Sequence, residues 1–179
     1  MSFENWHLTQ KKRFLNALPE KAFKPEPPLR IVHQNERQVK KKMLQKQLLR
    51  GAKSIAVVGF SDTPHRESHR IGTYLMDYYT VYKVNPALVS SEEEEKKDAT
   101  QGYYASLGDL PEKVDIVNVF RRSEFLDGVV KEAIEAEAGS VWAQTGVRDD
   151  DAKVRADEAR LPMVMDTCIF LEHQELLKD

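Results

Sequence analysis

A short apolar run that ends in a glycine constrains this chain more than any other feature. Residues 55–58, Ile-Ala-Val-Val, contain no polar alternation, which is typical of a strand buried on both faces of a parallel sheet. Gly59 follows the run, and a glycine lets the backbone turn sharply and come close to a ligand because it has no Cβ. The segment therefore predicts a first strand with a tight turn at its carboxyl end.

The residues after this glycine favour an anion. Ser61 and Ser68 carry hydroxyls, and Arg66 carries a fixed cationic fork. Pro64 stiffens the loop. We expect a helix to begin near Glu67 or Ser68, where its free amide groups would face the same space and favour a phosphate. An ordinary strand-to-helix connection is the alternative, which a glycine turn alone does not exclude.

The turn differs from the fingerprint of NAD-binding domains, which is G-x-G-x-x-G with an acidic residue about 20 positions later. Ser61 and Pro64 stand where the second and third glycines would be. The next expected strand ends in Asn85 and Pro86, where an NAD enzyme usually carries Asp or Glu. The sequence therefore disfavours NAD.

Length and composition set the outer bounds. The 179 residues suffice for one domain with a modest extension. No stretch approaches the roughly 20 apolar residues of a membrane span, and residues 1–14 lack the apolar block of a signal peptide, so we expect a cytoplasmic protein. Cys168 is the single cysteine, and the pair His65 and His69 has no obvious further ligands; we therefore expect no disulfide and no metal site.

Charge is distributed unevenly along the chain. Residues 1–53 hold 13 Lys and Arg against 4 acidic residues, whereas residues 54–179 hold 14 against 25. Residues 36–50 predict an amphipathic basic helix that docks on the acidic part. Its lysines surround the apolar residues Val39, Met43, Leu48 and Leu49. Contact with nucleic acid or an anionic surface is the alternative, and nucleic acid is disfavoured because no aromatic residues interleave these lysines.

A proline-rich arm precedes this helix, with Pro19, Pro25, Pro27 and Pro28. Aromatic residues of the arm can pack on a neighbour and support a homo-oligomer. These are Phe3, Trp6, Phe14 and Phe23. We therefore divide the chain into a basic extension, residues 1–50, and a domain, residues 51–179.

Beyond the turn, strand-like and helix-like segments alternate, which predicts a doubly wound, mainly parallel, Rossmann-like α/β sheet with β-α-β order throughout. Further strands are expected at 81–84, 103–104, 114–120, 141–143 and 163–165. Helices are expected at 68–78, after an N-cap at Ser123, and at 149–160. Residues 90–99, with four consecutive glutamates, predict an exposed excursion.

Polar or special residues follow the expected strands. In an open parallel sheet, ligands bind outside the carboxyl ends, where the strand order reverses. The candidates are Gly59, Ser61, Asn85, Pro86, Phe120, Arg121, Arg122, Gln144, Thr145, Gly146, Asp166 and Cys168. Arg121 or Arg122 could bind a terminal phosphate bidentately, or pair with Glu124 at the surface. Phe120 could flank a ligand or close the core.

Five segments in this order carry a resemblance: IAVVGFSDTPHRESHRIGTYL, YKVNP, GYYASLGDLPEKVDIVNVFRRSE, VWAQTGV and VMDTCIFLEH. Residues 54–173 resemble the small bacterial CoA-binding proteins, whose Rossmann-like domain is related to that of the succinyl-CoA synthetase α subunit. The resemblance implies a CoA site at Gly59, Phe60, Ser61, Arg66, Ser68, Asn85, Pro86, Phe120, Arg121, Gln144 and Gly146. The glutamate segment departs from the family pattern, as does Thr167, where arginine is frequent.

CoA agrees with the residues on a physical basis. It carries a pyrophosphate and a 3′-phosphate, and it needs no carboxylate for a ribose diol that is already esterified. The turn and the helix start would hold the pyrophosphate, and Arg66 or Arg121 would neutralise a phosphate. No catalytic set is evident, so we expect a non-catalytic CoA or acyl-CoA binding protein. The alternatives are a CoA-dependent or CoA-disulfide enzyme using Cys168, and a regulatory module whose basic arm binds nucleic acid.

Overall fold

The computed structural model describes residues 29–89 and 102–177. The chain divides into two units, Met1–Val39 and Lys40–Asp179, and the helix α2 (Leu29–Gly51) begins in the first and ends in the second. The prolines and aromatic residues of the predicted arm lie outside the described residues, as does the glutamate-rich excursion. In the described part, no helix is both long and apolar enough to cross a membrane.

Six strands form one sheet in the order β3-β2-β1-β4-β5-β6. They are β1 (Ser54–Val58), β2 (Thr80–Val84), β3 (Tyr103–Tyr104), β4 (Ile116–Val119), β5 (Val141–Ala143) and β6 (Met163–Val164). Each neighbouring pair is parallel, and Val57 of β1 lies between Lys83 and Asn118. The strand order is that of a doubly wound nucleotide-binding sheet, which reverses between β1 and β4. The predicted fold class is confirmed.

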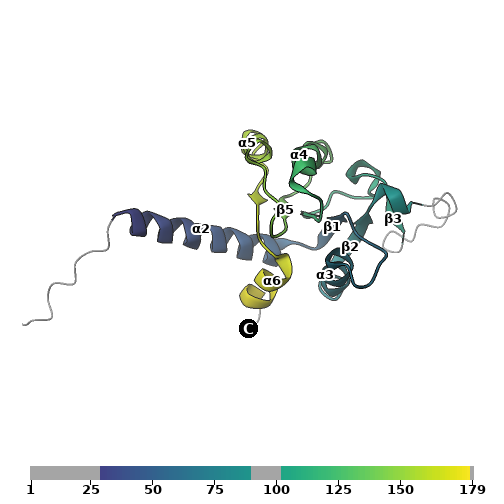
Figure 1. Ribbon diagram of the computed structural model, residues 1–179, viewed down its shortest axis with the longest axis horizontal. Coiled ribbons are helices and arrows are strands. Elements are labelled where there is room, and N and C mark those ends of the chain that lie inside the picture. Colours follow the sequence, from purple (N-terminus) through teal and green to yellow (C-terminus); the bar gives the residue numbers. More distant parts are fainter. Residues whose placement is uncertain (1–28, 90–101, 178–179) are drawn as a thin grey trace, which may run out of the picture. The chain divides into compact units, whose positions relative to one another are not determined.

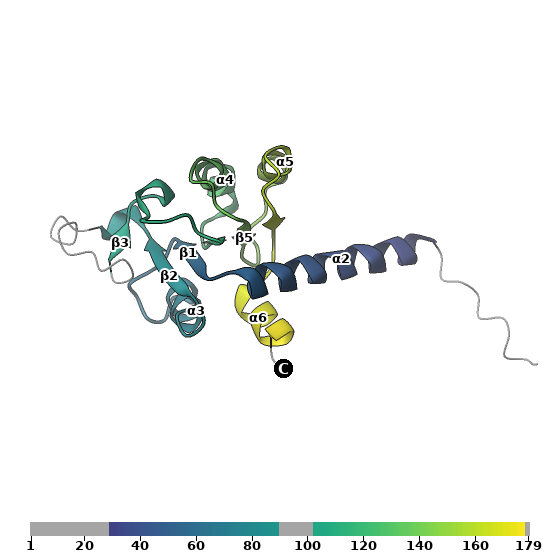
Figure 2. The same cartoon turned by 180° about the vertical axis from the view of Figure 1, so that it is seen from behind.

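Helices cover both faces of the sheet (Figure 1). On one face lie α4 (Leu126–Glu135) and α5 (Asp150–Glu158), and on the other lie α3 (Glu67–Leu75) and α6 (Ile169–Leu177), as the view from behind also shows (Figure 2). Successive strand residues point to opposite faces. Val117 and Val119 accordingly belong to the cluster of α4 and α5, and Ile116 to that of α3 and α6.

The carboxyl-terminal part of α2 packs on the cluster that α3 and α6 cover. Leu49 is 1% exposed, and Leu48 packs beside this cluster. The predicted helix over 36–50 is confirmed, but only Leu48 and Leu49 of its four expected apolar residues pack on the core. Val39 and Met43 are 57% and 67% exposed, whereas Gln45 is 1% exposed. Gln45 stands one turn before Leu49, so the buried stripe contains an amide in place of an aliphatic residue.

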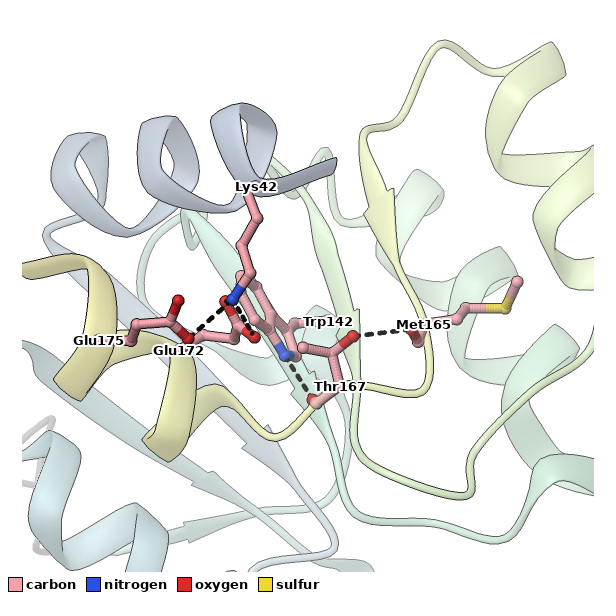
Figure 3. A network of polar contacts seen from close by, with 6 residues as sticks. All are labelled: Lys42, Trp142, Met165, Thr167, Glu172 and Glu175. Atoms are coloured by element: carbon pink, nitrogen blue, oxygen red, sulfur yellow. Dashed lines mark hydrogen bonds and ion pairs between the residues drawn. The ribbon is translucent and has the colours of Figure 1, made fainter. Parts of the chain in front are cut away.

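Charged contacts connect the second half of α2 to α6, and hydrogen bonds connect β5 to the loop between β6 and α6 (Figure 3). Lys42 Nζ lies 2.7 Å from Glu172 Oε2 and 2.9 Å from Glu175 Oε2, which raises the pKa of Lys42. The predicted attraction between the basic helix and the acidic domain is therefore observed as the ion pairs of Lys42. The buried Trp142 indole donates to the Thr167 carbonyl at 2.8 Å, and Thr167 Oγ1 donates to the Met165 carbonyl at 3.0 Å.

Two expectations about the connections are wrong. Ser123 does not cap α4, because a 3-10 helix (Ser123–Phe125) comes first and α4 begins at Leu126. Its hydroxyl instead donates to the Gly146 carbonyl at 3.3 Å and accepts from the Arg148 amide at 3.0 Å. The β-α-β order also fails between β3 and β4, where the chain forms only a 3-10 helix (Leu107–Asp109).

The last helix was not predicted from the sequence. α6 follows β6 after a short loop, and its residues Ile169 and His173 are buried. Their spacing of four is helical, but His173 is an unusual core residue, so the pattern is weak in sequence. The remaining strands and helices lie where the periodicity places them, with ends shifted by a few residues.

Candidate functional site

The turn after β1 touches the turn after β4. Gly59 has a φ of +87°, a conformation that favours glycine. A Cβ on this residue would lie 2.8 Å from the carbonyl oxygen of Phe120 and 3.6 Å from Cδ of Arg121. The predicted sharp turn is confirmed, and the close approach of Gly59 is made to the backbone of Phe120. The two turns therefore meet at the reversal point of the sheet.

The same turn is hydrogen-bonded to the start of α3. The amide of Ser61 donates to Ser68 Oγ at 3.2 Å, and the ring nitrogen Nδ1 of His69 lies 2.8 Å from the Ser61 carbonyl. Since a carbonyl only accepts, Nδ1 of His69 carries the proton. α3 begins at Glu67, as predicted. The two side chains of the first turn of α3 thus hold the loop in place.

Charge at the start of α3 is partly balanced within the helix. Arg66 precedes α3 in an extended conformation with an exposed side chain. Glu67 pairs with Arg70 at 2.8 Å, and both side chains are 65% exposed. The Glu67 carboxylate at the positive end of the helix dipole is therefore already matched by Arg70.

Asn85 connects the end of β2 to this turn. Its Nδ2 donates to the Phe60 carbonyl at 2.9 Å, and its Oδ1 accepts from the Ala87 amide at 3.2 Å. Pro86 is exposed and begins a 3-10 helix, Pro86–Leu88. Asn85 therefore fixes the path of the β1 turn from the neighbouring strand.

Phe60 supports the turn from within the core. Its side chain is 2% exposed, and the ring centroid lies 5.4 Å from that of His69 and 6.1 Å from that of Tyr103. A Cβ on Gly72 would lie 2.3 Å from the Phe60 ring, so the glycine of α3 makes room for it. Phe60 therefore packs as a core residue directly under the predicted phosphate turn.

The two arginines after β4 have different environments. Arg122 pairs with Glu124 at 2.9 Å, and its guanidinium lies 5.3 Å from the Phe125 ring, on an exposed part of the surface. Arg121 is half-buried and lies beside Gly59. Phe120 is half-buried and packs on the cluster of α3 and α6. Of the two cations, Arg121 is the one at the reversal point.

A buried amide pair lies one layer below these turns. Gln144 Nε2 donates to Asn118 Oδ1 at 2.6 Å, and the amide of Ile169 donates to Gln144 Oε1 at 3.3 Å. Asn118 is fully buried, and among the described residues its Nδ2 has no hydrogen-bond partner. An unsatisfied buried donor costs about 1–3 kcal/mol. Asn118 was not predicted, although an amide inside the apolar run IVNVF is a visible signal.

The loop after β5 is braced by its own neighbours. Gly146 has a φ of +79°, and its amide donates to Asp166 Oδ1 at 2.8 Å. Thr145 is exposed. Among the described residues, the contacts of Gly146 run to Asp166 and Ser123, away from the turn after β1.

The structure brings most of the predicted residues into one set. Contacts or chain continuity join Gly59, Phe60, Ser61, Ser68, Asn85, Phe120 and Arg121. Gln144 connects to β4 through Asn118. The remaining predicted residues, Arg66, Pro86 and Gly146, are exposed and lie at the periphery. This set combines a cation, a helix start and a buried donor at one sheet edge, which suits a polyanionic nucleotide.

Comparison with known proteins agrees with this geometry. The model of the CoA-binding domain family matches residues 53–174. The chain belongs to this family. The chain is also 39% identical over 131 residues to Uncharacterized protein YneT of Bacillus subtilis (strain 168), a match that covers 72% of this chain and 90% of that protein.

Solved structures similar to this member of the CoA-binding domain family share its fold. A Thermus thermophilus protein is 34% identical with a TM-score of 0.67, and the match covers 75% of this chain and 98% of that one. A hypothetical protein from Pyrococcus horikoshii OT3 is 31% identical, also with a TM-score of 0.67, covering 77% and 92%. The resemblance found in the sequence is therefore confirmed.

Proposed function

We propose that this chain binds CoA or an acyl-CoA non-catalytically at the carboxyl edge of β1, β4 and β5. The close approach of Gly59 to Phe120 carries the proposal, because it joins the turns after β1 and β4 at the reversal point of the sheet, with the Arg121 side chain beside Gly59. Nucleotides bind at this position in doubly wound sheets. Membership of the CoA-binding domain family supports CoA as the nucleotide.

Each part of the site has a role in this proposal. The pyrophosphate lies at the β1 turn and the first amides of α3, where the helix dipole favours an anion. Arg121 neutralises one phosphate and can do so bidentately, and Arg66 stands at the outer end of the same turn.

Thermal melting with CoA and with NAD tests the proposal. A ligand that binds only the folded state stabilises it by about 2.7 kcal/mol at 100 times its Kd, so CoA should raise Tm and NAD should not. Arg121→Ala should reduce the CoA shift. Arg122→Ala is the matched control, since that arginine pairs with Glu124 at the surface. Calorimetry that detects no heat with millimolar CoA would exclude the proposed function.

A second candidate is a thiol-disulfide reaction at Cys168. This cysteine is half-buried and lines a cavity next to α3. The thiolate of Cys168 would attack one sulfur of CoA disulfide, form a mixed disulfide with that CoA and release the other CoA as a thiolate, which takes up a proton from water. Mass spectrometry after incubation with CoA disulfide should then show a CoA adduct that a reductant removes and that Cys168→Ser lacks. An unmodified mass with reversible CoA binding favours the first proposal.

A further inference from the structure

A cavity of about 310 Å³ lies between the first turns of α3 and α6. Its walls are Glu67, Arg70 and Ile71 of α3, with Cys168, Phe170 and Leu171 at the start of α6. Both helices begin at the carboxyl edge of the sheet, and both lie on the same face (Figure 1). The cavity therefore adjoins the edge where the proposed CoA site lies.

The lining of this cavity is mainly apolar. Ile71 is 7% exposed and Leu171 is 60% exposed, so an aliphatic surface extends from the core to the solvent. The two charged residues, Glu67 and Arg70, pair with each other at 2.8 Å and are 65% exposed. Their charges are mutually satisfied at the outer edge. The interior of the cavity therefore favours an uncharged aliphatic group.

Aromatic contacts connect α3 and α6 farther along the two helices. Tyr74 Oη lies 2.9 Å from Nδ1 of His173, and the Tyr74 and Phe170 ring centroids are 4.7 Å apart in an edge-to-face arrangement. Tyr74 stands almost one turn beyond Ile71 on α3. These contacts hold the helices together behind the cavity. The space between the helices is thus bounded on the side away from the sheet edge.

The buried amide pair, Asn118 and Gln144, lies on the face of the sheet that α3 and α6 cover. Asn118 shares its face with Ile116, and Gln144 accepts from the Ile169 amide, one residue after Cys168. Asn118 and Gln144 are 0% and 6% exposed, so they support the sheet behind the cavity. The surface that a ligand meets in the cavity is therefore its mainly apolar lining.

We propose that this cavity holds the acyl chain of a CoA thioester, an inference that rests on the proposed CoA site. Small-molecule pockets typically measure about 300–1,000 Å³, so a space of 310 Å³ accepts a fragment and not a complete nucleotide. Because Arg70 is paired with Glu67, an acyl group with a terminal carboxylate has no cation to meet. The protein therefore prefers short, uncharged aliphatic acyl groups.

Calorimetric titration with CoA and with acetyl-, butyryl-, hexanoyl- and succinyl-CoA tests this inference. Burial of one methylene corresponds to roughly fourfold tighter binding. Affinity should rise with chain length until the cavity is full, and succinyl-CoA should bind less tightly than butyryl-CoA. If CoA binds and the acyl chain adds nothing, the inference is wrong while the proposed function stands. If neither CoA nor any thioester binds, the proposed function fails and the inference with it.

Two matched variants locate the effect. Leu171→Asp puts a charge on the cavity wall at an exposed position, and Val154→Asp does the same on α5, where Val154 is 56% exposed on the opposite face. Leu171→Asp should abolish the dependence on chain length and leave CoA affinity within about twofold. Val154→Asp should change neither. An unchanged chain-length dependence in Leu171→Asp would overturn the assignment to this cavity. Tm values without ligand that equal that of the parent protein confirm that both variants are folded.

Discussion

At the scale of single residues, Gly59 combines a φ of +87° with a backbone carbonyl 2.8 Å from where a Cβ would stand. Its sequence position predicts a turn, and a turn is what the structure shows. The carbonyl belongs to Phe120, which is distant from Gly59 in the sequence. Only the pairing of β1 with β4 brings the two residues together. Gly59 is therefore required for packing whether or not a ligand is present.

Gly59→Ala should lower the free energy of unfolding by about 1–3 kcal/mol, because the residue would be strained and its Cβ would press on the Phe120 carbonyl. Denaturant unfolding measures this change. Gly128→Ala is the control: Gly128 lies in α4 with nothing within 4 Å of an added Cβ. That substitution should stabilise by about 0.5–1 kcal/mol, since alanine is the better helix former. Equal effects at the two positions would contradict the packing role of Gly59.

His173 is a second residue whose environment decides its behaviour. It is 5% exposed, within 4.5–5.6 Å, centroid to centroid, of the rings of Tyr74, Tyr78 and Tyr79. Burial lowers the pKa of His173. Burial also raises the pKa values of Tyr74 and Tyr79 to about 12, so these two tyrosines keep their protons at neutral pH. His173 is therefore the ring in this cluster that responds to mild acid.

Stability should fall as the pH drops below the unfolded-state pKa of histidine, roughly 6.5, because the unfolded chain then takes up a proton that folded His173 resists. The contribution is complete above that pH and decreases until the folded pKa is reached, with a slope of at most about 1.4 kcal/mol per pH unit. In urea titrations from pH 7 to pH 5, His173→Phe should lose less stability than the parent protein. His65→Gln, at an exposed position, is the matched histidine substitution for this comparison.

At the scale of elements, the strands were well predicted because continuous apolar runs identify buried parallel strands. The apolar face of α2 was predicted only in part, because Leu48 and Leu49 pack on the core while Val39 and Met43 are exposed. Its sequence offers aliphatic residues on several sides, and only contact with α6 and the sheet decides that Leu49 is buried while Met43 is exposed. The start of α4 also required tertiary information, since Ser123 bonds the loop after β5 and not the helix.

Leu49→Ala should destabilise the protein by about 2–5 kcal/mol, because it leaves a cavity in a buried cluster. Thermal or denaturant unfolding gives the value. Met43→Ala, on the same helix, should change stability by no more than about 0.5 kcal/mol, since Met43 is 67% exposed. If both substitutions were equally mild, the end of α2 would not be part of the folded domain.

At the scale of the whole molecule, the strand order places the proposed ligand at one edge of the sheet. The reversal between β1 and β4 puts the turns after these strands next to each other. The opposite edge is closed by Asp115, whose carboxylate accepts from the amides of Lys53 and Ser54 at 2.7 and 3.0 Å. The two ends of the strands therefore differ in their chemistry, and we expect a ligand to bind at the carboxyl ends and not beside Asp115.

Hydrogen exchange with saturating CoA should show this asymmetry. At 100 times the Kd, openings that release the ligand become about 100-fold rarer, so amides in residues 59–68 and 118–121 should exchange more slowly by up to that factor. Amides in residues 53–54 and 139–140, at the opposite edge, should change much less. If exchange slowed only near Asp115, the ligand would not bind at the proposed CoA site.

The sequence by itself determined the local elements of this protein. Apolar runs, the glycine at position 59 and the hydroxyls that follow it specify a strand, a turn and a helix start, because these depend on backbone conformation and short-range hydrogen bonds. Only the tertiary structure decided which arginine lies at the reversal point, that the buried Asn118 donor has no partner among residues 29–89 and 102–177, and that α3 and α6 enclose a cavity. These features join segments distant in the chain, and strand order and packing bring them together.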